Sequence, residues 1–229
     1  MNFLYIQEKF ARKLSYYFHA TIFYIIKKPL YKLYFNTEGN NFQCKGCLIK
    51  SSINIYGNKN QIIIDHGVRL INVNIVIIGN NNKLIISQNS RINEKGRIRI
   101  EDTNNQLKIG KNVDIQSIYF SLADKNTSIT IGDNCLFSSD IVFRTSDSHS
   151  IIDCESKKRI NLGDSITIGN HVWLSNGVNI LKGVSVGDNS IIGTKSIVTK
   201  NIPSNSIAVG IPAKVTRQNV TWCKKESNI

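Results

Sequence analysis

Two different hydrophobic patterns run along this chain of 229 residues. From residue 37 to about residue 130, a polar turn rich in asparagine recurs, and a run of branched aliphatic residues follows each turn. GNKNQIII and GNNNKLII are two examples, and the turns begin at residues 39, 57, 79, 102 and 124. An internal repeat of this length defines the architecture of a chain, so it is interpreted before any single motif.

The second pattern has a strict period of six. Residues 168–203 divide into IGNHVW, LSNGVN, ILKGVS, VGDNSI, IGTKSI and VTKNIP, and each hexad begins with a branched aliphatic residue. Neither the 3.6-residue period of a helix nor simple strand alternation produces this pattern. A coil of three short strands joined by tight turns does, with the aliphatic position inside a triangular prism. Stacked turns of three hexads bury a core that no single turn could bury.

These hexads carry a resemblance. The run from IGNHVW to IPAKVTR resembles the hexapeptide-repeat acyltransferases, and within them the sugar O-acetyltransferases, over residues 131–217. The stretch from DSH through KKRIN to GNHVW is similar to O-acetyltransferases of capsular or surface polysaccharides. The left-handed sense of the family's β-helix comes from the resemblance alone, because crossovers are usually right-handed.

The expected fold is therefore all-β. It is a left-handed parallel β-helix of hexapeptide repeats over residues 37–205, with an extruded loop at 150–165. A basic, aromatic-rich helical segment at 1–36 precedes it, and a C-terminal tail at 206–229 follows.

His149 lies in FRTSDSHSIID, where the hexad count from Ile131 calls for an aliphatic residue and the repeat breaks. The chain then leaves the coil until Ile166. The resemblance makes His149 the general base that takes a proton from a sugar hydroxyl, whose oxygen attacks the thioester of acetyl-CoA. Imidazole changes charge near neutral pH, which suits this step. A structural turn is the alternative interpretation.

Asp147 shares a face with His149 on an extended strand, so it could orient the imidazole, bind a sugar hydroxyl or cap a turn. By resemblance, Trp173 holds the cofactor arm, with core packing as the alternative. The backbone amide of Ser175 or Asn176 would stabilise the oxyanion.

The other cofactor contacts are also implied by the resemblance. Basic residues suit the nucleotide phosphates, although a solvated lysine is equally consistent with the pattern. The expected contacts are Asn176, Thr194, Thr199 and Lys200 for the pantetheine arm, and Lys214 and Arg217 for the phosphates. Arg159 is expected either to meet the substrate or to hold the loop.

Residues 1–35 contain 11 of the 17 Phe and Tyr residues, and six Lys or Arg against one acidic residue. Their most apolar part, residues 14–26, is shorter than the roughly 20 residues that span a bilayer. No cleavage site of a signal peptide follows it. The segment is either an interfacial membrane anchor or a helix that packs on a neighbouring subunit.

The net charge of +13 suits an anionic partner, or it reflects a lysine-rich solvated surface. The five cysteines, at positions 44, 47, 135, 154 and 223, are interpreted as packing residues in a reduced compartment. No metal site is expected, because CKGC lacks a second ligand pair and His19, His66 and His171 have structural interpretations.

The resemblance thus implies an acetyl-CoA-dependent O-acetyltransferase that modifies a bacterial capsule or O-antigen polysaccharide or its precursor. The expected partners are a glycan acceptor, acidic or lipid-linked, and, as in the family, two further copies in a homotrimer, without nucleic acid. The expected location is the cytoplasm, with peripheral contact at the inner face of the membrane. The alternatives are an N-acetyltransferase of an amino sugar or small xenobiotic on the same fold, and a non-catalytic β-helix scaffold.

Overall fold

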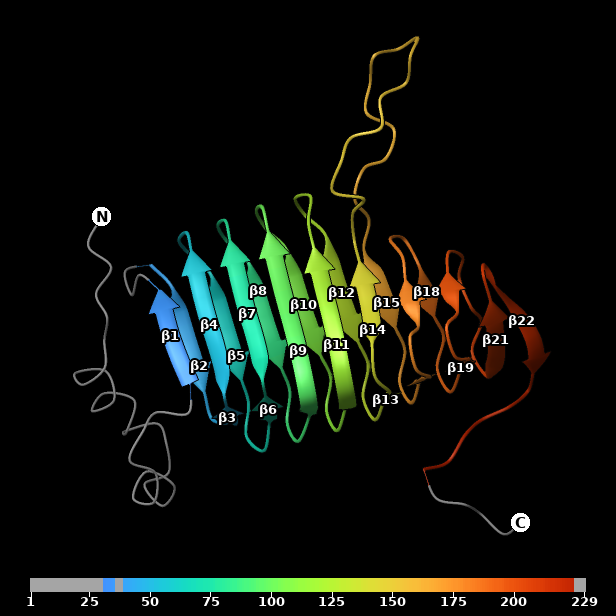
Figure 1. Cartoon of the computed structure of the whole chain (residues 1–229), viewed down its shortest axis with the longest axis horizontal. Coiled ribbons are helices and arrows are strands. Elements are labelled where there is room, and N and C mark those ends of the chain that lie inside the picture. The colour runs from blue at the N-terminus through green and yellow to red at the C-terminus, as the bar shows by residue number, and fades with distance from the viewer. Residues whose placement is uncertain (1–30, 36–38, 225–229) are drawn as a thin grey trace.

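The structure, a computed structural model, describes residues 31–35 and 39–224. In this part the chain forms a β-solenoid of about seven turns, in which each turn stacks on the one before (Figure 1). The strands are β1 (Tyr31–Phe35), β2 (Asn41–Cys44), β3 (Cys47–Ile49), β4 (Ser51–Tyr56), β5 (Gln61–Ile64), β6 (Arg69–Ile71), β7 (Val73–Ile78), β8 (Lys83–Ile86), β9 (Arg91–Glu101), β10 (Gln106–Ile109), β11 (Asp114–Leu122), β12 (Ser128–Ile131), β13 (Leu136–Phe137), β14 (Ile141–Arg144), β15 (Ile166–Ile168), β16 (Trp173–Leu174), β17 (Asn179–Ile180), β18 (Ser185–Val186), β19 (Ile191–Ile192), β20 (Ile197–Val198), β21 (Ser206–Gly210) and β22 (Ala213–Gln218).

The strands stack into three parallel faces. Face 1 consists of β2, β5, β8, β10, β12, β15 and β18. Face 2 runs through β3, β6, the first parts of β9 and β11, and then β13, β16, β19 and β21. Face 3 runs through β4, β7, the second parts of β9 and β11, and then β14, β17 and β20. The long strands β9 and β11 therefore continue from face 2 to face 3.

The first hexad positions fill the interior, as the six-residue period predicts. They are all at most 1% exposed: Ile168, Leu174, Ile180, Val186, Ile192 and Val198. On face 3 the core becomes aromatic where β11 and β14 pair, and the ring centroids of Phe120 and Phe143 lie 5.1 Å apart. Because the inward side chains stack in register, each turn covers the apolar face of the previous one.

The recurrent asparagines form a ladder at the corner between faces 3 and 1. The Oδ1 atoms of Asn60, Asn82 and Asn105 each accept a hydrogen bond from the backbone N–H of the equivalent residue one turn later. The Nδ2 atoms of Asn60 and Asn82 donate to the carbonyls of Gly79 and Asp102 in the following turn, and that of Asn105 donates to the carbonyl of Glu101 in its own turn. These asparagines are only 1% exposed, so a residue type expected in a solvated turn instead satisfies buried backbone groups.

Three segments bear on the predicted domain boundaries. The loop between β14 and β15 projects away from the solenoid, close to the predicted limits of 150–165 (Figure 1). Residues 206–218, assigned to a tail, contain β21, which extends face 2, and β22, which pairs antiparallel with β21. Residues 31–35 form β1 beside β4, which corrects the helical prediction there, and residues 1–30 lie outside the described part.

Candidate active site

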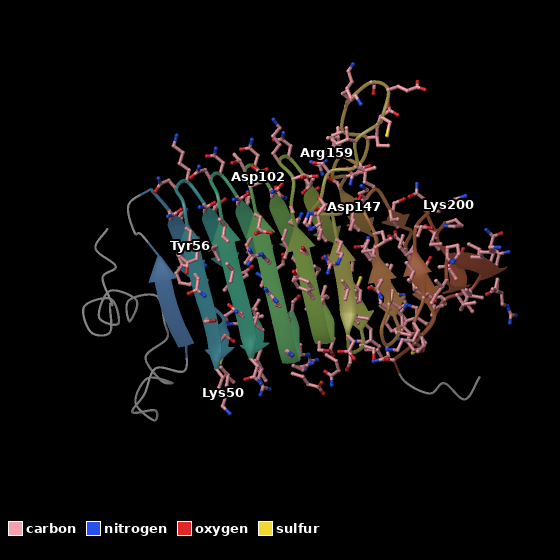
Figure 2. The ribbon with its side chains drawn as sticks, turned by 45° about the horizontal axis from the view of Figure 1, so that its top comes forward. Lys50, Tyr56, Asp102, Asp147, Arg159 and Lys200 are labelled. Atoms are coloured by element: carbon pink, nitrogen blue, oxygen red, sulfur yellow. The ribbon has the colours of Figure 1, made fainter. Side chains whose placement is uncertain are left out.

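The extruded loop is tied to the solenoid by an ion pair at its base. Arg159 donates from Nη1 to Oδ1 of Asp124 at 3.0 Å and from Nη2 to Oδ2 at 2.6 Å. This bidentate contact lowers the pKa of the Asp124 carboxyl, and a hydrogen bond from Ser146 adds to the effect. Figure 2 shows Arg159 at the foot of the loop, close to Asp147. Of the two roles expected for Arg159, this contact is the one that holds the loop.

Asn161 connects the two arms of the loop. Its Oδ1 accepts from the backbone N–H of Ile151 at 2.7 Å and from Nε of Arg159 at 3.2 Å. Its Nδ2 donates to Oδ2 of Asp147 and to the backbone carbonyl of His149, both at 2.8 Å. Asn161 is 7% exposed, so these bonds form at a site largely closed to water. The backbone that carries His149 is thereby fixed by a side chain from the returning arm.

His149 sits in a tight turn and presents its imidazole to solvent. Its backbone N–H donates to the carbonyl of Asp147 at 2.8 Å, and Ser148 between them adopts a left-handed conformation with φ of 66°. The side chain is exposed, and within the described ranges the imidazole has no hydrogen-bond partner. Both ring nitrogens are therefore available to a substrate hydroxyl.

Asp147 does not contact the imidazole. Its Oδ2 accepts from Nζ of Lys182 at 2.5 Å and from Asn161. These two bonds, with that of Lys182 the larger cause, lower the pKa of the Asp147 carboxyl, so it is ionised at neutral pH. Lys182 comes from the turn between β17 and β18 and also donates to the backbone carbonyl of Asn161 at 3.2 Å. Asp147 therefore anchors the turn that carries His149 instead of orienting its ring.

Trp173 opens β16 on face 2 and is 37% exposed. Parallel register places Leu136, Ile191 and Ile207 in line with it along the stack. In the terminal hairpin, Arg217 pairs with Ile207. An apolar strip thus leads from the indole of Trp173 towards a cation, which suits the extended arm and the phosphates of coenzyme A.

The predicted oxyanion donors differ in availability. The backbone N–H of Ser175 donates to the carbonyl of Ile192 at 2.9 Å, which corrects the expectation that this amide is free. The backbone N–H of Asn176 has no acceptor in the described part of the chain, and its carbonyl accepts from Lys195. Thr194, exposed beside Lys195, lies at the same corner one turn later. The Asn176 amide is the better oxyanion donor of the two.

Thr199 and Lys200 lie away from the apolar strip, whereas Lys214 shares β22 with Arg217. Thr199 and Lys200 are exposed at the corner between faces 3 and 1, in the turn that follows Lys182 (Figure 2). Lys214 and Arg217 are exposed on β22.

His149 and Trp173 lie on opposite edges of face 1, because β15 runs between them. A single chain therefore holds the base on one edge and the cofactor strip beyond the other.

The C-terminal segment covers the corner beside Trp173. The ring of Trp222 stacks on His171 with centroids 4.2 Å apart, and its Nε1–H donates to the His171 carbonyl at 2.7 Å. The Trp222 ring also lies 6.0 Å from that of Trp173. His171 occupies a turn with φ of 54°, as its hexad position predicts, and has a packing role.

The five cysteines are all free. Burial raises the pKa of the Cys44 thiol to about 11 and that of Cys135 to about 12. Cys154 and Cys223 are exposed. Across residues 31–35 and 39–224, no group of three His, Cys, Asp or Glu side chains is arranged to hold a metal ion. The same ranges contain no helix with the length and hydropathy that a membrane crossing requires.

Comparison with known proteins gives a consistent result. The sequence pattern of the bacterial transferase hexapeptide family (six repeats) matches residues 165–200. Over 139 residues the chain is 39% identical to the polysialic acid O-acetyltransferase of Escherichia coli O1:K1 / APEC. The aligned part is 59% of this chain and 45% of that relative, so the chain spans less than half of the curated relative's length.

Two solved structures are similar over most of the chain. The polySia specific acetyltransferase NeuO is 35% identical with a TM-score of 0.81, and the match covers 87% of this chain and 92% of that one. The polysialic acid O-acetyltransferase OatWY is 29% identical with a TM-score of 0.69, covering 82% and 89% of the two chains.

Proposed function

Because the chain belongs to the hexapeptide-repeat acetyltransferases, we propose that it transfers the acetyl group of acetyl-CoA to a hydroxyl of polysialic acid. The observation that carries the proposal is the match to NeuO along 87% of this chain, with 35% identity and a TM-score of 0.81. The exposed imidazole of His149 at the base of that loop supplies the chemistry. A capsule or surface polymer is the natural acceptor for such an enzyme.

In the proposed mechanism, a ring nitrogen of His149 takes the proton of the sugar hydroxyl as the oxygen attacks the thioester carbonyl. The Asn176 amide donates a hydrogen bond to the oxyanion of the tetrahedral intermediate. When the intermediate collapses, the carbon–sulfur bond breaks and the imidazolium returns the proton to the leaving thiolate. The products are an O-acetyl ester and free coenzyme A, and the base is regenerated.

The site is completed by a second copy of the chain in a homotrimer. If face 1 of each copy turns towards a threefold axis, the His149 edge of one copy meets the Trp173 edge of the next. The outward residues of face 1 in its last three strands support this packing, because they are small and uncharged: Ser128, Thr130, Thr167 and Ser185. Such a surface can be buried between subunits without leaving a charge unpaired. The left-handed sense of the coil is part of the same proposal.

The enzyme would act in the cytoplasm, at the inner face of the membrane where the polymer is made. The six Lys or Arg residues among residues 1–35 support this location, since basic aromatic segments bind anionic lipid surfaces. An N-terminal helix that contacts lipid or a neighbouring subunit belongs to this proposal too.

The test is an acceptor panel. The purified full chain is incubated with acetyl-CoA and polysialic acid, colominic acid fragments, neutral dextran, glucosamine or chloramphenicol, and each product is analysed by mass spectrometry and NMR. We expect O-acetyl groups on the sialic acid polymers only. Transfer to an amine with none to the sialic polymers would favour an N-acetyltransferase, and no transfer to any acceptor would favour a scaffold.

A further inference from the structure

Face 3 carries a basic cluster that no part of the mechanism uses. Arg97 on β9 and Arg144 on β14 flank Tyr119 on β11, from the turn before it and the turn after it. Their Cζ atoms lie 5.3 and 5.6 Å from the centroid of the tyrosine ring. We name this set, Arg97, Tyr119 and Arg144, the arginine cluster.

Both arginines lack an acidic partner. Neither Arg97 nor Arg144 forms an ion pair with a carboxylate of the described residues, and both are exposed. Three acidic groups of the neighbouring strands and loops are engaged by other cations. Glu101 pairs with Arg99, Asp124 with Arg159, and Asp147 with Lys182. The cluster is therefore a focus of uncompensated positive charge.

The tyrosine explains how two like charges are held there. A guanidinium over an aromatic face is attracted to the electron-rich ring, which offsets part of the repulsion between the two charges. The N–H groups of a guanidinium that lies over a ring still point outward in the guanidinium plane. In that geometry two of them can donate hydrogen bonds to one carboxylate. Arg97 is in register with Tyr119 and Arg144 with Ser121, two residues further along the strand. Two strand spacings of about 4.8 Å and this offset place the two arginine backbones roughly 12 Å apart.

The cluster lies close to the catalytic base. Arg144 is the last residue of β14, and the chain reaches His149 five residues later. Five residues span at most about 17 Å when fully extended. A polymer with a carboxylate on each sugar could therefore hold one sugar at the arginines while the hydroxyl of another sugar reaches the imidazole.

We propose that the arginine cluster is a binding subsite for carboxylates of an acidic polysaccharide, and that it positions the polysaccharide near His149. The proposal deepens the proposed function and rests on it. The subsite acts on acceptor affinity, because it touches sugars remote from the reacting hydroxyl. It leaves the chemical step and the binding of acetyl-CoA unchanged.

The experiment compares the double variant Arg97→Gln/Arg144→Gln with the wild-type chain. Fluorescence anisotropy with labelled polysialic acid, without acetyl-CoA, measures binding directly, and steady-state kinetics measure KM and kcat. We expect the Kd and the KM for polysialic acid to rise at least about tenfold, with kcat and the KM for acetyl-CoA unchanged. Added salt should weaken wild-type binding more than variant binding.

A matched control removes the same charge elsewhere. Lys45→Gln/Arg69→Gln replaces two exposed cations in the early turns, far along the chain from the loop, and should leave Kd within about twofold of wild type. The proposal is overturned if the double variant binds as wild type does, or if the control weakens binding equally. It is also overturned if wild-type chain does not bind the polymer. A chain that binds polysialic acid through the cluster but transfers no acetyl group would refute the proposed function alone.

Discussion

Asn161 gives the sharpest test of how the loop positions the base. In Asn161→Ala, four side-chain hydrogen bonds disappear, including those to Asp147 and to the carbonyl of His149. The backbone N–H of Ile151 loses its acceptor, and the two arms of the loop are no longer joined at this point. The solenoid core is untouched, because the loop lies between β14 and β15.

The size of the effect follows from those four bonds. At about 0.5–1.5 kcal/mol net for each, the variant loses roughly 2–6 kcal/mol of loop anchoring. Each 1.4 kcal/mol changes an equilibrium about tenfold, so a loss near 3 kcal/mol lowers the population of the active arrangement about 10²-fold. A misplaced base costs a similar factor in rate. We expect kcat to fall about 10²-fold, with a small change in Tm.

The assay measures initial rates of acetyl transfer to polysialic acid at saturating substrate, together with thermal melting by circular dichroism. The control is Asn82→Ala, which removes a buried asparagine from the ladder at a remote turn. It should lower Tm by about 4–8 °C because backbone groups are orphaned, and leave kcat near wild type. A kcat for Asn161→Ala within about a factor of two of wild type would refute the reasoning.

Three further predictions follow from the packing and the charges. Phe143→Ala should lower the free energy of unfolding by about 3–5 kcal/mol, measured by urea denaturation, because it empties a buried site against Phe120. The pKa of the Asp124 carboxyl is lowered from 3.8, so the stability that its pair with Arg159 contributes is fully present above pH 3.8 and is lost as the pH falls through the lowered value. The difference in stability between wild type and Asp124→Asn should therefore shrink in thermal melts between pH 6 and pH 3. Iodoacetamide should label Cys154 and Cys223 but not Cys44 or Cys135 in the native protein, as peptide mass spectrometry would show, because the last two thiols are buried and have raised pKa values.

The fold could be predicted from sequence wherever the period was strict. Ile180 and Val198 were assigned to the interior from the hexad count, and both are fully buried. The hexad count predicts burial because each turn repeats the same three-strand geometry, so residues at equivalent positions of successive turns have the same environment. The terminal hairpin was missed, because SNSIAVGIPAKVTR leaves the six-residue period and no neighbouring repeat defines its register.

The sequence identifies the asparagines as a repeat of polar turns but does not predict the ladder. Asn60 and Asn82 have the composition of an exposed corner, and only stacking in register closes them off from water. The hydrogen bonds of such a residue are made to neighbouring turns, so the sequence of its own turn does not show that it is buried. The repeat at about 22 residues was the signal that could have revealed it.

His149 and Trp173 were identified through the resemblance, whereas their surroundings were not. Lys182 contacts Asp147 although 35 residues of sequence separate them. The contact depends on the path of a loop that has no repeat period. Asn161 lies inside that loop, so nothing in the local sequence distinguishes it from a surface asparagine. Contacts of this kind depend on where the loop returns to the solenoid, which the hexad count does not determine.

The most direct test of the account is acetyl transfer by His149→Gln. Gln keeps a polar group of similar reach but cannot accept the proton, and Asn161 still holds the backbone of residue 149. With polysialic acid and acetyl-CoA, mass spectrometry should show transfer at least about 10²-fold slower than wild type, with unchanged melting temperature and unchanged binding of the polymer. Transfer at the wild-type rate would contradict the assignment of His149 as the base.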